Sequence, residues 1–339
     1  MTEYGVAADI GTTNIALALL DLSSGGVLAE HSFANPQRRY GADVVSRIAA
    51  ASGGAAEEMR RLVTEGAAAG IETLAAGRKA GRIAVAGNTV MTHLLLGFDC
   101  EGLGAAPFRP GGRVEGDYRL FGAAARVFPW ISAFVGGDVV AGLLHVPKRD
   151  RFLLIDLGTN GEMALYDRGK LSVASAAAGP AFERAGQTAS AVIAGLARLI
   201  REGYIDGTGL LAEGAPGPFT QKGVRALQLA KAAVRAGLDV LLEEAELSFD
   251  SLDAVYLAGG AGQALNPENA ETVGLLPPGL AGRIIPAGNA ALGGAVRMLR
   301  EPEWAAAETA ALLAAAREVP LAGDPRFAEL FIEYMRFPP

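Results

Sequence analysis

RFLLIDLGTNGEMALYD, residues 151–167, runs from four apolar residues into a carboxylate, Asp156, at the end of an expected buried strand. A charge in that place is unfavourable unless it is paired or binds a cation. Gly158 and Gly161 follow it and indicate a tight turn into a second strand. The stretch therefore predicts two strands joined by a polar turn that begins at a carboxylate.

The same plan occurs at the start of the chain, where Asp9 precedes a similar turn. Asp9 and Asp156 occupy equivalent places, 147 residues apart. Strands are expected in two matching sets of three, at 4–9, 14–21 and 27–33 and again at 152–157, 161–166 and 171–177. Two copies of one module are the simplest interpretation.

Helical and strand patterns alternate after each set, which favours an α/β layer architecture. A buried strand is expected in RIAVAGNTV, residues 82–90. Helices are expected at 40–51, 55–76, 135–145, 221–245 and 303–317, and DPRFAELFIEYMRF, residues 324–337, is expected to pack on the core.

Length and composition limit the function. A chain of 339 residues favours about two domains. The net charge of -7, without a long basic run, argues against nucleic acid as a partner. Cys100 is the only cysteine, and the three histidines lie far apart, which excludes an iron-sulfur cluster or a zinc site of the usual spacing.

The N-terminus has Glu3 and Asp9 where a secretory signal would need a basic start and an apolar stretch. The longest apolar-rich run without charge, residues 83–98, has 16 residues and is shorter than the ~20 that span a bilayer. We therefore expect a soluble cytoplasmic protein that does not enter a membrane.

Three glycine-containing turns carry the chemistry. In DIGTTN (residues 9–14) and DLGTNG (residues 156–161), glycine lets the backbone approach a ligand closely, and threonine hydroxyls and backbone N–H groups are donors for anionic oxygens. The aspartate can hold hydrated Mg²⁺. DAVYLAGGAGQALNP, residues 253–267, ends an apolar strand in three glycines that suit a base and a phosphate. Asx-type capping turns and an ordinary strand-to-helix turn are the alternatives.

The order of these turns resembles the superfamily of actin, heat-shock chaperones and sugar kinases, in which two duplicated ribonuclease-H-like domains enclose ATP in a cleft. In that resemblance FVGGDVVAGLL (residues 134–144) and GNAALGGA (residues 288–295) are the two connecting helices. Walker A, dinucleotide-binding and protein-kinase motifs are absent from the sequence. The resemblance implies a first domain at 1–148, a second at 149–300 and a C-terminal helical tail at 301–339 that packs back on the core.

A narrower resemblance rests on five further segments and covers nearly the whole chain. They are NPQRRYGADVVSRI (35–48), AGNTVMTHLLLG (86–97), APFRP (106–110), AAGPAFE (177–183) and QLAKAAVRAG (228–237). With the phosphate turns they look like the ATP-dependent reductive activators of corrinoid enzymes. Members of that family typically carry a ferredoxin-like iron-sulfur domain, and this sequence, which begins almost at the first turn, holds only Cys100. The expected electron donor is therefore a separate ferredoxin-like protein.

The resemblance implies which residues form the Mg-ATP site. Asp9 and Asp156 would hold Mg²⁺ through water from opposite sides of the cleft, and Asp138 would orient the attacking water. The other expected contacts to ATP are Gly11, Thr12, Thr13, Asn14, Gly158, Thr159, Asn160, Gly161, Gly259, Gly260 and Gly262, with Gln228, Lys231 and Arg235 near adenosine.

Structural explanations stand beside these roles. Asp138 can cap its helix, and Glu162 is expected to be a solvated strand residue rather than a partner of the site. Gln228, Lys231 and Arg235 can equally form a solvated helix face. Asn35, Arg39 and Asn88 either face a partner or ligand or hold turns.

The expected function is an ATPase that couples domain closure to reduction of a corrinoid protein or corrinoid-dependent methyltransferase from Co(II) to Co(I). Two alternatives remain at this level: an ATP-switched binding or maturation module for a metalloenzyme, and a small-molecule kinase of the same fold. The oligomeric state is open, with a homodimer among the options.

Overall fold

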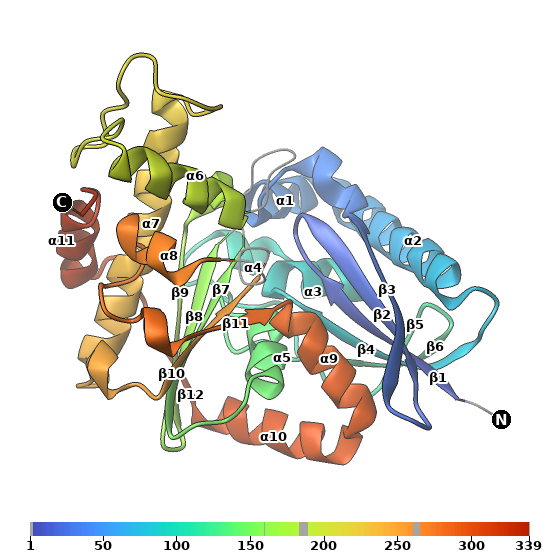
Figure 1. The fold of residues 1–339 in the computed structure, drawn as a ribbon. Coiled ribbons are helices and arrows are strands. Elements are labelled where there is room, and N and C mark those ends of the chain that lie inside the picture. Colours follow the sequence, from blue (N-terminus) through green and yellow to red (C-terminus); the bar gives the residue numbers. More distant parts are fainter. Residues whose placement is uncertain (1–2, 159, 183–188, 260–264, 339) are drawn as a thin grey trace. The chain divides into compact units, whose positions relative to one another are not determined.

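The computed structural model describes residues 3–158, 160–182, 189–259 and 265–338 (Figure 1). The chain forms two compact units. Unit 1 consists of Met1–Pro147 and Ala290–Ala314, and unit 2 consists of Lys148–Asn289 and Ala315–Pro339. Within the described residues, no helix is both long enough and apolar enough to cross a membrane.

Unit 1 is built on a six-stranded sheet with the order β3-β2-β1-β4-β6-β5. β1, β2 and β3 are successive antiparallel strands, while β4 lies parallel to β1 and β6 parallel to β4. The strands are β1 (Tyr4–Ile10), β2 (Asn14–Asp21), β3 (Gly26–Ala34), β4 (Ala80–Gly87), β5 (Tyr118–Leu120) and β6 (Ala123–Val127).

Helices cover this sheet because β1 alternates between two buried faces. Val6 and Ala8 belong to the core that α2 completes with Met59 and Val63, whereas Gly5 faces Leu299 of α9. The helical segments of unit 1 are η1 (Pro36–Tyr40), α1 (Val44–Ala50), η2 (Ala51–Ala55), α2 (Ala56–Ala75), α3 (Thr89–Leu96), α4 (Glu101–Gly104), α5 (Gly137–His145), α9 (Ala290–Arg300) and α10 (Pro302–Ala315).

Unit 2 repeats the plan with the order β11-β10-β7-β8-β9-β12. β7, β8 and β9 are antiparallel neighbours, and β10 and β11 add in parallel on the other side of β7. The strands are β7 (Arg151–Leu157), β8 (Gly161–Asp167), β9 (Lys170–Ala176), β10 (Ala254–Ala258), β11 (Ile284–Gly288) and β12 (Ala316–Glu318). Read in reverse, the order β9-β8-β7-β10-β11 of unit 2 matches the order β3-β2-β1-β4-β6 of unit 1, which confirms the predicted duplication of a ribonuclease-H-like module.

The long helix α7 supplies much of the core of unit 2. Leu227, Val234, Leu238 and Leu241 belong to the core of this unit, as their spacing predicts, and α7 packs on β8 and β9. The helical segments of unit 2 are η3 (Gly179–Phe182), α6 (Ala189–Arg201), α7 (Gln221–Glu244), η4 (Phe249–Ser251), α8 (Pro267–Thr272), η5 (Ala281–Arg283) and α11 (Pro325–Glu333).

Two expected elements differ in the structure. The strand expected at 82–90 ends at Gly87, because the side chain of Asn88 accepts a hydrogen bond from Met91 N and so begins α3. The tail expected at 301–339 is not one element: α10 lies mainly in unit 1, whereas β12 pairs with β9 and α11 packs on α7 in unit 2.

Candidate functional site

The first predicted phosphate turn joins β1 to β2 at the carboxyl end of β1. Asp9 is half-buried just before it. A Cβ atom on Gly11 would lie 2.6 Å from Asn14 O, so the turn closes too tightly for a side chain at this position. Thr12 is buried and Thr13 half-buried, whereas Asn14 is exposed at the start of β2.

Three successive carbonyls of this turn are held by hydrogen bonds. Asn35 Nδ2 donates to Gly11 O at 2.8 Å, Arg47 Nη2 donates to Thr12 O at 2.5 Å, and Asn35 N donates to Thr13 O at 2.9 Å. In a planar trans peptide the N–H points away from the carbonyl. Holding the Gly11 and Thr12 carbonyls therefore turns the N–H groups of Thr12 and Thr13 toward the opposite side, an arrangement that suits an anionic oxygen.

Two further segments of unit 1 meet this turn. Asn88 Nδ2 donates to Thr12 Oγ1 at 2.9 Å, while the same side chain caps α3. A Cβ on Gly136 would lie 2.5 Å from Asn88 Cα, and one on Gly137 would lie 2.5 Å from Phe128 O. Gly136 therefore lets the start of α5 approach the end of β4, and Gly137 lets it approach the end of β6.

Asp138 lies in the first turn of α5, where its Oδ1 accepts a hydrogen bond from Val139 N at 2.8 Å. The side chain is half-buried, and burial raises the pKa of its carboxyl to about 6. A carboxylate held at the same edge of the sheet as Asn88 and Thr12 can accept a proton from a polar ligand. Asp138 thus binds a backbone N–H in the first turn of its own helix, whose N-cap is Gly136, and its catalytic role stays a prediction.

The second predicted turn has the same place in unit 2. Asp156 is half-buried near the end of β7, and Ala258 of β10 is its partner in the parallel register. Gly259 follows with φ at 87°, and a Cβ there would lie 2.4 Å from Asp156 Oδ1. Gly158 N donates to Asn160 O at 3.0 Å, which closes the turn. The ends of β7 and β10 therefore form a cradle that only glycine permits beside the carboxylate.

Glu162 is buried and lies opposite Asp156 in the antiparallel register of β7 and β8. The expectation of a solvated strand residue is therefore wrong. Gly161 is buried against α7, since a Cβ on it would lie 2.6 Å from Val234 Cγ2. Three residues of the predicted site, Thr159, Gly260 and Gly262, lie outside the described residues.

Gln228 and Lys231, two of the three residues of α7 predicted to lie near adenosine, form hydrogen bonds to the C-terminal segment. Gln228 Nε2 donates to Thr208 O at 3.0 Å and to Met335 O at 2.8 Å. Lys231 Nζ donates to Arg336 O and lies 5.0 Å from the centre of the Phe337 ring. Both side chains are buried, so they do not form a solvated face, and their contact with adenosine stays a prediction.

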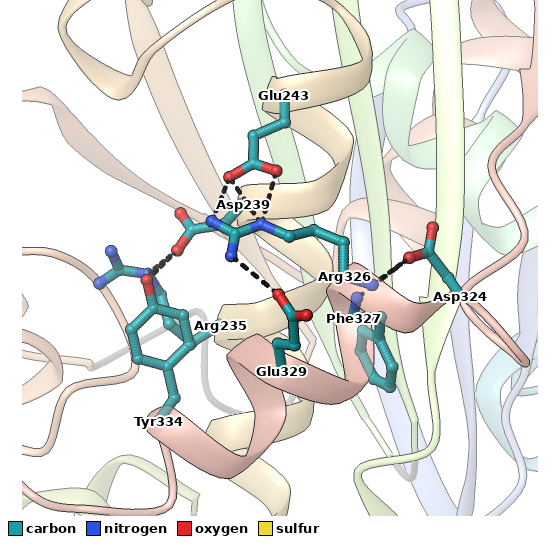
Figure 2. A network of polar contacts seen from close by, with 8 residues as sticks. All are labelled: Arg235, Asp239, Glu243, Asp324, Arg326, Phe327, Glu329 and Tyr334. Carbon is teal, nitrogen blue, oxygen red and sulfur yellow. Dashed lines mark hydrogen bonds and ion pairs between the residues drawn. The ribbon is translucent and has the colours of Figure 1, made fainter.

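Arg235, the third of these residues, also belongs to a contact with the C-terminal segment (Figure 2). Its Nε donates to Asp239 Oδ2 at 3.2 Å, and its guanidinium lies 4.7 Å from the centre of the Tyr334 ring. Tyr334 also donates to Asp239, and Arg326 of α11 forms a two-pronged ion pair with Glu243 at 2.9 and 3.0 Å. The polar side chains of this face of α7 thus bind α11 and its C-terminal extension.

The residues whose role stayed open now have structural partners. Asn35 and Asn88 hold the first phosphate turn, as described above. Arg39 is exposed, pairs with Glu58 and lies 5.1 Å from the centre of the Tyr40 ring. Arg47, which the sequence does not single out, is the additional residue that contacts the turn.

The carboxylates near the two turns suit Mg²⁺, which is bound largely through water, better than a metal that needs three or more direct protein ligands. Within the described ranges, no group of three His, Cys, Asp or Glu side chains is placed to bind a metal. Mg²⁺ usually keeps several waters and needs only one or two carboxylates together with phosphate oxygens. Asp156 offers one such carboxylate, and the adjacent glycine leaves room beside it. Cys100 is buried, and burial raises the pKa of its thiol to about 11, which disfavours the thiolate that a metal requires.

The duplicated sheets and the glycine turns at equivalent strand ends define a member of the actin-like ASKHA superfamily. Residues 4–147 match the family model of the RACo middle region, and residues 150–191 and 212–339 match that of the C-terminal domain of RACo, the ASKHA domain. The chain belongs to the RACo family of corrinoid activators.

Individual relatives agree with this assignment. The chain is 32% identical to the corrinoid activation enzyme RamQ of Eubacterium limosum, over 97% of this chain and 69% of RamQ. It is 26% identical to the Co(II) methylated amine-specific corrinoid protein reductase of Methanosarcina barkeri, over 54% of this chain and 46% of that protein. The solved structure of a reductive activator for a corrinoid, iron-sulfur protein superposes with a TM-score of 0.91 at 27% identity, covering 99% of this chain and 66% of that one.

Proposed function

We propose that this protein binds and hydrolyses ATP and uses that reaction to return a corrinoid protein from Co(II) to Co(I). The observation that carries the proposal is the pair of glycine turns, each beside a half-buried aspartate at the end of the first strand of a duplicated sheet, in a chain of the corrinoid activator family. The names of the two relatives, a corrinoid activation enzyme and a corrinoid protein reductase, support the choice of a corrinoid protein or corrinoid-dependent methyltransferase as the partner.

In this proposal the two turns are half-sites for one Mg-ATP. The N–H groups of the first turn and the glycine cradle of the second receive phosphate oxygens, which supplies the positioning and electrostatic stabilisation that phosphoryl transfer needs. Asp9 and Asp156 hold Mg²⁺ through water, and Asp138 orients the water that attacks the terminal phosphate.

The electron comes from a low-potential donor of the ferredoxin type outside these 339 residues. Cys100 is the single cysteine of the sequence, so a cysteine-bound cluster cannot be assembled from them. ATP has a thermodynamic purpose here. For scale, moving a one-electron equilibrium by about 300 mV corresponds to about 7 kcal/mol at about 59 mV per factor of ten, whereas ordinary allosteric coupling supplies about 1 to 3 kcal/mol.

The decisive experiment follows cobalt directly. Purified protein is mixed with Mg-ATP, a low-potential reductant and a Co(II) corrinoid protein, and the Co(I) absorbance is recorded. We expect Co(I) to form faster or further than with the donor alone, and to lose this gain with Asp156→Asn. Equal Co(I) formation with and without the protein would refute the proposed activity.

Binding stoichiometry tests the shared nucleotide separately. Calorimetric titration with ATP and Mg²⁺ should give one site per chain, and Asp9→Asn and Asp156→Asn should each weaken that one site. Two independent sites, each lost with only one of the variants, would contradict the assignment of both turns to one ATP.

A further inference from the structure

Arg47 is a buried cation directly beneath the first phosphate turn. Its exposed fraction is 0%, although it lies on α1, a short helix near the surface. The guanidinium donates to Thr12 O at 2.5 Å, to Gly41 O at 3.2 Å and to Gln37 Oε1 at 3.4 Å, and it lies 3.1 Å from Met91 S. Arg47 therefore connects the turn to η1, to Gly41 and to α3.

The acceptors around Arg47 are all neutral. Among the residues that the structure describes, no carboxylate forms an ion pair with it. Burial lowers the pKa of the Arg47 guanidinium to about 10. The positive charge of Arg38 also lowers this pKa, and the negative charge of Asp43 raises it. Arg47 is still protonated at neutral pH, so the region beneath the turn holds a positive charge that nearby carboxylates do not neutralise.

A charge is not needed to satisfy the carbonyls. Asn35, a neutral side chain, holds the Gly11 carbonyl of the neighbouring peptide at 2.8 Å. Burying an ion without a counter-ion costs free energy of desolvation. The guanidinium of Arg47 beside Thr12 therefore calls for a compensating interaction. A polyphosphate on the far side of the Thr12–Thr13 peptide is an anion of the required kind. A charged donor on the Thr12 carbonyl also polarises that peptide and strengthens the N–H of Thr13 as a donor.

We propose that Arg47 is a positioning residue of the first phosphate turn: it fixes the Thr12 carbonyl so that the Thr13 N–H faces the phosphates, and its charge favours binding of the polyphosphate over the nucleoside. This proposal rests on the proposed binding of ATP. It predicts that the contribution of Arg47 increases with the phosphate charge of the ligand.

The test compares ATP, ADP and adenosine on folded protein in the presence of Mg²⁺. ATP and ADP are titrated by calorimetry, and adenosine is followed by ligand-observed NMR. Arg47→Met is expected to weaken ATP about 10- to 100-fold, as loss of a hydrogen bond from a charged group does. ADP should be weakened less and adenosine by no more than about twofold. Arg47→Lys keeps the charge without the planar fork, so it should lose less ATP affinity than Arg47→Met.

Arg297→Met is the matched control. Arg297 also lies in unit 1 and donates to a backbone carbonyl, that of Leu144, at 2.7 Å. It contacts α5 rather than the turn, so its loss should leave the ratio of ATP to adenosine affinity unchanged even if the melting temperature falls. Should Arg47→Met not fold, Arg47→Gln provides the neutral variant for the same comparison.

The outcomes separate the two proposals. If the wild-type protein does not bind ATP, the proposed function fails. If the wild type binds ATP but the neutral variants bind it equally well, or lose affinity for all three ligands in parallel, Arg47 is only a structural residue and the inference is overturned. A loss confined to the phosphorylated ligands supports it.

Discussion

Replacing Lys231 with methionine is expected to change how the stability of the protein depends on pH. The side chain is 2% exposed in the contact between α7 and the C-terminal segment, where Nζ donates to Arg336 O. Burial, with a smaller contribution from the charge of Arg235, lowers the pKa of the ammonium from 10.5 to about 8. The folded protein therefore disfavours the charged form, and methionine removes the titrating group while retaining most of the apolar stem.

The size and sign of the effect follow from the two pKa values. Because the folded pKa is lower than the unfolded one, protonated Lys231 lowers stability below pH 8, and this cost disappears as the pH rises toward 10.5. At about 1.4 kcal/mol per pH unit, the cost is about 3 kcal/mol at pH 7 and about 1 kcal/mol at pH 10. The wild type should therefore gain about 2 kcal/mol relative to Lys231→Met between pH 7 and pH 10.

Urea unfolding of both proteins at pH 7, 8, 9 and 10 measures this difference. The series stops at pH 10 because burial raises the pKa of Tyr334 to about 12, so that its ionisation would lower the stability of both proteins above that range. Lys222→Met, an exposed lysine of the same helix, is the control and should run parallel to the wild type. Parallel curves for the wild type and Lys231→Met would refute the assignment of a buried, destabilising charge to Lys231.

Three other substitutions test the site and its surroundings. Asp138→Asn should lower ATP hydrolysis by about 100-fold or more while ATP affinity changes less than about threefold; wild-type hydrolysis would remove Asp138 from the reaction. Gly259→Ala should weaken ATP binding at least about tenfold, because it combines about 1 to 2 kcal/mol of backbone strain with a collision against Asp156. Gly169→Ala is its control, since its φ is 96° with open space around a Cβ, and it should retain ATP affinity. Tyr334→Phe should cost about 1.5 to 3 kcal/mol in urea unfolding, because the hydrogen bond to a charged aspartate on α7 is lost, and should leave ATP affinity unchanged; unchanged stability would show that this bond contributes little.

Patterns confined to short stretches of the chain made the fold predictable. Alternating apolar residues and glycine turns predict the strands at both copies, and the equal positions of Asp9 and Asp156 reveal the duplication before any contact is known. The five helices expected from apolar spacing and end signals are confirmed within a few residues. The last of them ends at Ala315, and the residues that follow form the unexpected short strand β12, which pairs with β9.

The roles of individual polar residues depended on contacts that are distant in sequence. Gln228 and Lys231 have the spacing of a solvated helix face, but their partners lie more than a hundred residues later, at Met335 and Arg336. Arg47 has the pattern of a surface helix residue, and its burial depends on the fold of the turn at Thr12. Such pairings have no local signature. The spacing of Gln228 and Lys231 therefore allowed a solvated face, the resemblance placed them near adenosine, and Arg47 was not singled out at all.

The two copies share strand positions but not the means by which their turns are supported. In unit 1, the carbonyls of the turn are held from outside by Asn35 and Arg47, so side chains of other elements fix the direction of its N–H groups. In unit 2, the turn closes on itself through Gly158 N and Asn160 O, and Gly161 rests on Val234 of α7. The next residue of α7, Arg235, contacts the C-terminal segment. Duplication has therefore preserved the aspartate and the glycine turn, whose geometry suits the proposed phosphate contacts, while the supporting residues have diverged because several different contacts can hold the same backbone.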